Sequence, residues 1–303
     1  MSISATMVRD LREKTSAGML DCKKALEETN GDFEAAVEWL RKKGLSSAAK
    51  KSDRLASEGI VAAKVTGKVG VLLEVNSETD FVAKNDGFKA FVAETAQTVI
   101  TAKPADATAL LDVKMVSGKS VGETLKESIA KIGENLVIRR FARVESNGLV
   151  HTYIHGDGKI GVLVELTAAS SNDLVKTFAN DICLHIAAMA PIALSPDQVP
   201  AAVVAKETEI LKAKALESGK KPEMLDKIVG GQINKFLAES CLLEQAFVKN
   251  PDLKVKEYLA ETAKKSGESF QIKQFVRFEL GEGLQKKSNN FAEEVAAQAQ
   301  AKH

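Results

Sequence analysis

The first 44 residues carry a helical pattern of apolar positions. Side chains at spacings of three and four mark three successive helix faces, and two short polar breaks separate them. The faces are Val8, Leu11 and Arg12, then Leu20, Cys22, Lys23, Ala25 and Leu26, and then Phe33, Ala36, Val37 and Leu40. The pattern predicts a bundle of three short helices, which is small enough to favour a recognition module over a catalytic unit.

The ends of the third helix are also indicated. Asp32 is expected to cap its N-terminus with a carboxylate, and the basic run Arg41-Lys42-Lys43 is expected to complement the dipole at its C-terminal end. Residues 50–53 then have the composition of a linker.

One pattern occurs twice after this linker. Each copy begins with a strand, a glycine turn and a second strand, continues with an amphipathic helix, and ends with a further helix and strand. The matching segments are 59–75 with 148–166, 85–91 with 172–178, and 121–145 with 255–279. The repeat predicts an α+β chain with a duplicated α/β core and antiparallel sheets.

The copies differ first by an insertion in the second one, at residues 196–239. Two helical patterns joined at residues 218–222 predict an antiparallel helical hairpin there. Two alternatives stay open: the hairpin folds back onto the core, or it projects as an arm that offers a surface to a partner.

The second difference follows the second strand, where the first copy has residues 77–84 and the second only residues 168–171. The added residues include Asp80 and Phe81. One interpretation is structural, with the ring packed in the core and the acid at a helix terminus. The other is that both side chains enter a partner protein, because the second copy is expected to fold without an aromatic at this point.

Composition narrows the function classes. Of 303 residues, 45% are hydrophobic and 27% charged, as in a globular chain, and the net charge of +1 offers no general attraction for nucleic acid or anionic lipid. The first residues lack the features of a secretory signal, and there is no apolar run of about 18 residues, so we expect a cytoplasmic chain without membrane contact. Three widely spaced cysteines, Cys22, Cys183 and Cys241, favour reduced thiols.

Enzyme motifs are weak. Residues 156–161 spell GxGxxG, but an apolar strand pattern follows where a dinucleotide fold needs a helix. Cys183 and His185 lie on opposite sides of a helix and cannot act together as nucleophile and base. His151 and His155 give two metal ligands at most. We therefore expect no catalytic residue, no metal site and no cofactor.

This sequence resembles one known family over essentially the whole chain, and three stretches carry the resemblance most specifically. They are LREKTSAGMLDCKKAL at 11–26, EVNSETDFVAKN at 74–85 and VRFELGEG at 276–283. The family is that of the bacterial translation elongation factor Ts, the guanine-nucleotide exchange factor of elongation factor Tu. The resemblance implies an N-terminal module similar to ubiquitin-associated (UBA) domains, two related core halves, a helical hairpin and a C-terminal helical module.

The resemblance also implies functional residues. Thr79, Asp80, Phe81 and Val82 are similar to the family's Thr-Asp-Phe-Val motif, which enters the GTPase near its magnesium site. The aromatic residue would lodge between helices of the GTPase, and the acid would disturb the network around its Mg²⁺. Lys23 in the N-terminal module and the pair His155 and Gly156 would be further contacts with elongation factor Tu.

These observations predict five segments: a UBA-like module at 1–52, core halves at 53–146 and at 147–195 with 240–280, the hairpin at 196–239, and a C-terminal module at 281–303. The predicted function is exchange of GDP on elongation factor Tu, without direct binding to nucleic acid. The alternative is an RNA- or ribosome-associated binding protein without exchange activity. A homodimer and a 2:2 complex with the GTPase both stay open.

Overall fold

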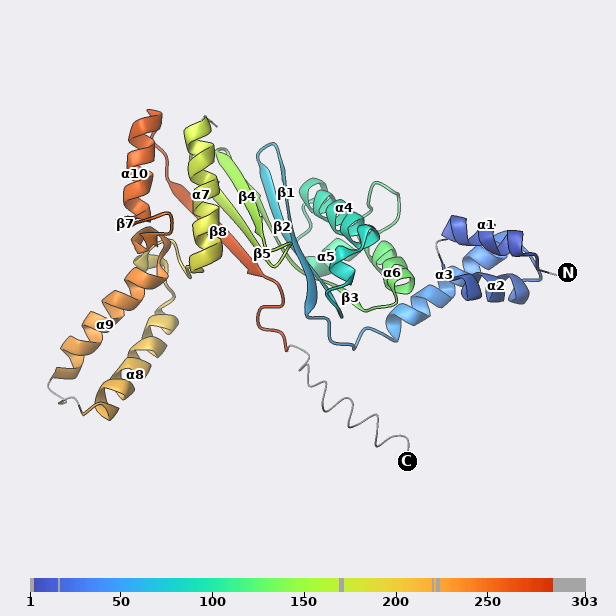
Figure 1. Ribbon diagram of the computed structural model, residues 1–303, viewed down its shortest axis with the longest axis horizontal. Coiled ribbons are helices and arrows are strands. Elements are labelled where there is room, and N and C mark those ends of the chain that lie inside the picture. Colours follow the sequence, from blue (N-terminus) through green and yellow to red (C-terminus); the bar gives the residue numbers. More distant parts are fainter. Residues whose placement is uncertain (1–2, 16, 169–171, 220, 222–223, 286–303) are drawn as a thin grey trace. The chain divides into compact units, whose positions relative to one another are not determined.

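The computed structural model of the chain describes residues 3–15, 17–168, 172–219, 221 and 224–285. They form a mixed fold of helices and small antiparallel sheets (Figure 1). Two compact units divide the chain. The first comprises residues 1–60, 73–140 and 279–303, and the second comprises residues 61–72 and 141–278. The five segment boundaries predicted from the sequence stay a prediction.

The N-terminal bundle consists of α1 (Ala5–Thr15), α2 (Met19–Glu28) and α3 (Phe33–Ala49). Leu11, Cys22 and Leu26 are buried at its centre. The predicted cap is confirmed, since the Asp32 carboxylate accepts the Ala35 N–H at 2.9 Å. Leu20, which the pattern places on an apolar face, is 82% exposed, and that part of the prediction is wrong.

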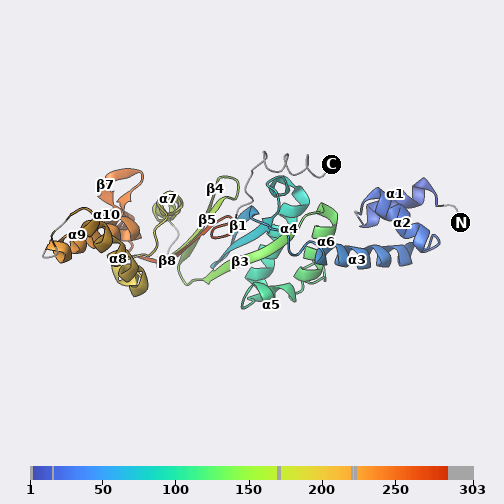
Figure 2. The same ribbon diagram turned by 90° about the horizontal axis from the view of Figure 1, so that it is seen from below.

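The third helix is longer than its sequence suggests. It continues through Gly44 to Ala49, so the run Arg41-Lys42-Lys43 lies inside the helix and does not complement its C-terminal dipole. These side chains pair with Glu123 at 2.5 Å, Glu38 at 2.9 Å and Asp21 at 2.5 Å, respectively. The prolonged helix packs on α6 (Val121–Ile132), as Figure 2 shows. Packing on α6 offsets the cost of a glycine in the helix interior.

Apart from the short helix at 107–111 in the first copy and the insertion in the second, the same succession of elements occurs twice, as the repeat predicts. The first copy contains β1 (Glu58–Thr66), β2 (Val69–Ser77), α4 (Asp86–Ala102), α5 (Ala107–Leu111), α6 and β3 (Leu136–Glu145). The second contains β4 (Leu149–His155), β5 (Ile160–Leu166), α7 (Asp173–Met189), α10 (Val255–Ser266) and β8 (Ile272–Glu279). The sheets have the orders β1-β2-β3 and β4-β5-β8, so in both the hairpin's second strand is central. The helices α4 and α7 both begin after an asparagine cap, Asn85 and Asn172.

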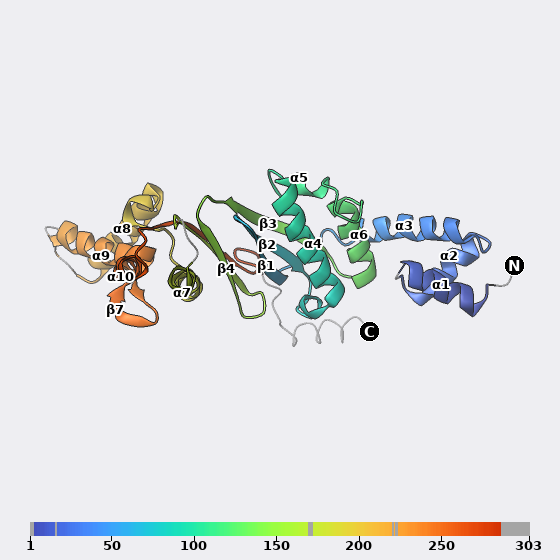
Figure 3. The same ribbon diagram turned by 90° about the horizontal axis from the view of Figure 1, so that it is seen from above.

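The insertion forms two helices side by side, α8 (Ala201–Glu217) and α9 (Leu225–Ser240) (Figure 3). Pro196–Gln198 forms a short 3-10 turn before them, and Leu242–Glu244 another after them. Val199 packs with Ala193 and Cys241 at the base of the pair. The helices pack on each other and extend away from α7 and α10. The short strands β6 (Ala246–Phe247) and β7 (Asn250–Lys254) follow.

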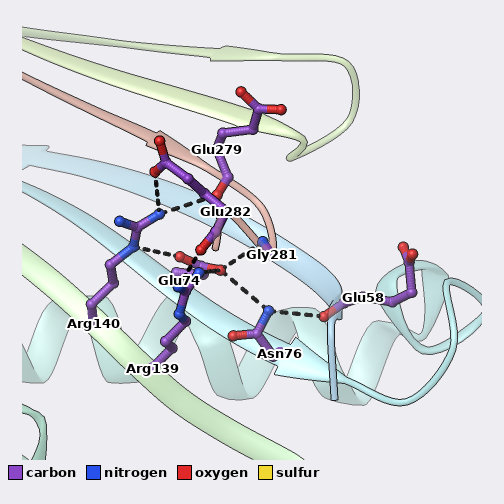
Figure 4. A network of polar contacts seen from close by, with 8 residues as sticks. All are labelled: Glu58, Glu74, Asn76, Arg139, Arg140, Glu279, Gly281 and Glu282. Atoms are coloured by element: carbon purple, nitrogen blue, oxygen red, sulfur yellow. Dashed lines mark hydrogen bonds and ion pairs between the residues drawn. The ribbon is translucent and has the colours of Figure 1, made fainter. Parts of the chain in front are cut away.

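A buried carboxylate on β2 holds the chain segment that follows β8 (Figure 4). Glu74 accepts hydrogen bonds from Arg139 Nη1 at 2.9 Å, Arg140 Nε at 2.6 Å and the Gly281 N–H at 2.9 Å. Arg140 also donates to the carboxylate of Glu282 at 3.0 Å. Gly281 and Glu282 are thereby fixed to the sheet. Residues 286–303, most of the predicted C-terminal helical module, lie outside the described residues.

The second copy has a matching carboxylate. Glu165 on β5 is also buried and accepts hydrogen bonds from Lys273 Nζ at 3.0 Å and Gln274 Nε2 at 2.6 Å, both on β8. The repeat therefore places a carboxylate on each central strand and its polar partners on the third strand.

Candidate partner-binding loop

The connection from β2 to α4 presents one large apolar side chain to solvent. Phe81 is 76% exposed, and Asp80 beside it is exposed as well. A 3-10 turn, Val82–Lys84, follows directly, and its first residue, Val82, is buried. The interpretation that Phe81 packs in the core is therefore wrong, because its ring stands outside the core of the described structure.

The remaining candidates in this loop face inward. The Thr79 N–H donates to Glu134 Oε2 at 2.9 Å, and the Thr79 hydroxyl donates to Glu134 Oε1 at 2.6 Å. Thr79 is half-buried and Val82 is buried. The four motif residues thus divide into two that hold the loop and two, Asp80 and Phe81, that face solvent.

A hollow of about 420 Å³ adjoins the exposed ring. It lies between the loop, the start of α4 and the end of α6, all in the first compact unit. Its lining consists of Phe81, Val82, Asn85, Gly87, Ser128, Lys131, Ile132 and Glu134. The combination of one aromatic ring, two aliphatic side chains and two charged ones suits a protein surface better than a small polar substrate.

A larger hollow, about 790 Å³, lies between the N-terminal bundle and α6. Ion pairs cross its lining: Arg41 with Glu123 at 2.5 Å, and Lys119 with Glu127 at 2.7 Å. These ion pairs neutralise opposite charges along the walls of the hollow. No pattern in the sequence indicates this hollow, because α3 extends further than its apolar spacing predicts.

The other predicted contacts lie on separate elements. Lys23 is on α2 in the first unit, where its exposed ammonium group is 3.8 Å from the Glu27 carboxylate. His155 ends β4 in the second unit, and its Nδ1 is 3.0 Å from the Tyr153 hydroxyl. Gly156 follows with φ +59°, a left-handed conformation that favours glycine. Neither Lys23 nor His155 lines the hollow beside Phe81.

The enzyme motifs have structural explanations. Residues 156–159 form the turn between β4 and β5, and a strand follows them, as the sequence analysis expected. Cys183 and His185 are both fully buried in α7. Burial raises the pKa of the Cys183 thiol and lowers the pKa of His185, whose Nε2 is 2.9 Å from Gln245 Oε1. These groups are packed in the core, where no substrate reaches them.

Within the described part of the chain, no three or more His, Cys, Asp or Glu side chains gather as a metal site would require. No helix among the described residues is both long and apolar enough to cross a membrane. The loop presents one aromatic ring and one carboxylate to solvent.

Comparison with known proteins decides the family. The model of the family described as Elongation factor TS matches residues 78–282, which include the loop. The chain belongs to the elongation factor Ts family. It is 57% identical to the elongation factor Ts of Bdellovibrio bacteriovorus, over 98% of this chain and 99% of that protein. It is 49% identical to that of Clostridioides difficile and 50% identical to that of Syntrophotalea carbinolica, each over 98% of this chain and 99% of the relative.

Elongation factors Ts are nucleotide-exchange factors for elongation factor Tu rather than catalytic enzymes. This chain has that role in translation elongation, as its identity to these relatives over nearly its whole length supports.

Proposed function

We propose that the loop at residues 79–82 is the element by which this chain releases GDP from elongation factor Tu. Phe81 inserts between helices of the GTPase, and Asp80 disturbs the network that holds the partner's Mg²⁺. One observation carries the proposal: a phenylalanine that is 76% exposed stands on a loop whose neighbouring residues are hydrogen-bonded or buried.

The energetics require more than this ring. Burying Phe81 in the partner contributes about 1.5–3 kcal/mol. Accelerating GDP release by about 10⁴ requires roughly 5.5 kcal/mol of barrier lowering. Further contacts therefore cooperate, and Lys23, His155 and Gly156 are the candidates. Coupling between two ligands of one protein is reciprocal. If this chain weakens the binding of GDP and Mg²⁺ to the GTPase by some factor, GDP and Mg²⁺ must weaken the binding of this chain to the GTPase by the same factor.

The finer architecture belongs to the same proposal. The three-helix bundle acts as a UBA-like module, and together with the C-terminal module at 281–303 it grips the GTPase. The arm at 196–239 offers a further surface for association. Two assemblies could use it, a homodimer of this chain or a 2:2 complex with the GTPase. The chain acts in the cytoplasm, by binding protein and not nucleic acid.

The test is the rate at which a fluorescent GDP leaves elongation factor Tu on mixing with the full chain. Phe81→Ala is expected to slow release at least about tenfold, the equivalent of losing 1.4 kcal/mol. Its melting temperature should stay within about 2 °C of the parent, because an exposed side chain contributes little to folding. Asp80→Ala should reduce mainly the part of the acceleration that depends on Mg²⁺ concentration.

Val116→Ala is the matched control. Val116 is 92% exposed in the same compact unit but lies outside the loop, so its truncation should leave release unchanged. If Phe81→Ala releases GDP at the parent rate, the loop is not the exchange element.

A further inference from the structure

Two carboxylates tie the loop to the turn that follows α6. Glu134, in that turn, accepts both the N–H and the hydroxyl of Thr79, at 2.9 and 2.6 Å. Both oxygens of one carboxylate are therefore used on a single loop residue. Hydrogen bonds to an ionised acceptor are stronger than those between neutral groups.

The second carboxylate makes the reverse connection. Glu78, in the loop, accepts the Asn135 N–H at 2.7 Å, and Arg54 Nη1 lies 3.4 Å from the same oxygen. The buried Asn135 side chain in turn donates to the Arg54 carbonyl at 2.8 Å. Each segment thus supplies a carboxylate to a backbone N–H of the other, which fixes their relative position.

The other side of the loop is fixed by backbone and packing. The N–H groups of Ala83 and Lys84 donate to the carbonyls of Asp80 and Phe81 at 3.2 and 3.1 Å, and Val82 is buried. The backbone of Asp80 and Phe81 is held from both sides, while their side chains extend into solvent. A loop ordered in this way loses little conformational entropy when it binds.

We propose that Glu134 is a positioning residue for nucleotide exchange: it keeps the loop in the one conformation that presents Asp80 and Phe81 to the GTPase. The inference rests on the proposed function of the loop. Glu134 acts on the partner through Thr79, which donates to both of its carboxylate oxygens. Without it, a smaller fraction of the chain holds the loop in the binding conformation, and the apparent dissociation constant rises in inverse proportion to that fraction.

The internal repeat supplies a matched control. Glu268 follows Gly267 at the end of α10, as Glu134 follows Gly133 at the end of α6. The sequence of the second copy is four residues shorter at the loop and lacks the Asp-Phe pair. A substitution at Glu268 therefore removes an equivalent carboxylate without touching the loop.

The experiment measures GDP release from elongation factor Tu against the concentration of the full chain. Glu134→Ala is expected to raise the half-saturating concentration roughly tenfold and to leave the limiting rate within about twofold, because the loop adopts the same conformation once bound. Glu134→Gln, which keeps one acceptor oxygen, should fall between parent and Glu134→Ala. Glu268→Ala should match the parent.

Thr79→Val removes the hydroxyl partner alone and provides a second test should Glu134→Ala fold poorly. It should raise the half-saturating concentration by itself and add little in the Glu134→Ala background, since both act on one contact.

Two results would overturn the inference. One is a parent-like curve for Glu134→Ala and Thr79→Val alongside slow release by Phe81→Ala. The other is a fall in limiting rate at unchanged half-saturation, which would mean that Glu134 acts on the bound nucleotide site. Parent-like release by Phe81→Ala would instead refute the loop's function itself, so the two failures are distinguishable.

Discussion

Replacing Glu74 by glutamine should destabilise the first compact unit. The substitution removes the counter-charge from Arg139 and Arg140 but retains an oxygen that can accept the Gly281 N–H. Breaking a buried ion pair from one side costs about 3–5 kcal/mol. Because glutamine preserves one acceptor, the lower end applies, about 3 kcal/mol. At about 2–4 °C per kcal/mol, the melting temperature of the transition that includes this unit should fall by about 6–12 °C.

The effect should depend on pH. Burial raises the pKa of Glu74, but hydrogen bonds from Gly281, Arg139 and Arg140 outweigh it and hold that pKa below its ordinary value. The folded chain therefore binds the Glu74 proton more weakly than the unfolded chain does. The stabilisation is complete above the ordinary pKa of about 4.3 and is lost as the pH falls through the lower folded value. The stability gap between parent and Glu74→Gln should be level from about pH 5 to 8 and close below about pH 4.

Glu165→Gln is the control in the second copy. Its cationic partner Lys273 is more than half exposed, and Gln274 can still donate to the new amide oxygen, so the expected cost is only about 1 kcal/mol. Thermal melts give the stabilities, and amide hydrogen exchange at residues 279–284 reports the contact directly. If Glu74→Gln and Glu165→Gln have equal melting temperatures, and amide hydrogen exchange at residues 279–284 is the same as in the parent, then Glu74 does not anchor residues 279–284.

Two further predictions concern whole segments. Replacing residues 196–239 by a short Gly/Ser linker should leave the rest folded by circular dichroism, because the backbone pairs Ile192–Ser240 and Leu242–Ala193 keep the two ends together; light scattering should then show fewer chains per particle, for the chain alone or with the GTPase, and an unfolded product would assign the arm to the core. Deleting residues 1–51 should preserve the sheets but severely weaken binding to elongation factor Tu, as measured by calorimetry. If the shortened chain binds with full affinity, the bundle does not take part in binding this partner.

Local signals in the sequence predicted much of the fold. Asp32 is predicted as a helix cap, and the matched segments 85–91 and 172–178 are each predicted to open a helix. In the structure Asp32, Asn85 and Asn172 all accept backbone N–H groups three positions ahead, within a single helical turn. Such contacts depend only on neighbouring residues, so their pattern is visible in one dimension. The repeat was equally visible, because both copies use the same polar and apolar alternation for the same strands.

Features that depend on distant residues were not visible. The third helix passes Gly44 because α6 packs against its second half, and Glu123, far away in the sequence, pairs with Arg41. Helical spacing placed Leu20 with its apolar neighbours but could not reveal that this side chain turns outward. A periodicity defines a face without defining what covers it.

The candidate loop illustrates the same limit. The difference between the two copies in the sequence singles out Asp80 and Phe81, and the structure adds that both are exposed. The comparison could not separate Thr79 and Val82, which face inward, from these two. Nor could it find Glu134, because nothing in the chain marks a glutamate 55 residues away as the partner of Thr79.

The duplication suggests how stability and function are divided in this chain. Glu74 and Glu165 occupy matching strands and satisfy the same requirement of the fold, a buried carboxylate with donors on the neighbouring strand. The first copy then adds the loop around Phe81, whose Asp-Phe pair is absent from the sequence of the second copy. Substitutions at matched positions should therefore act mainly on unfolding, whereas substitutions confined to the additions of the first copy should act on exchange. Glu134 belongs to both classes. It has a matched residue in the second copy, Glu268, but it holds a loop that is present only in the sequence of the first copy.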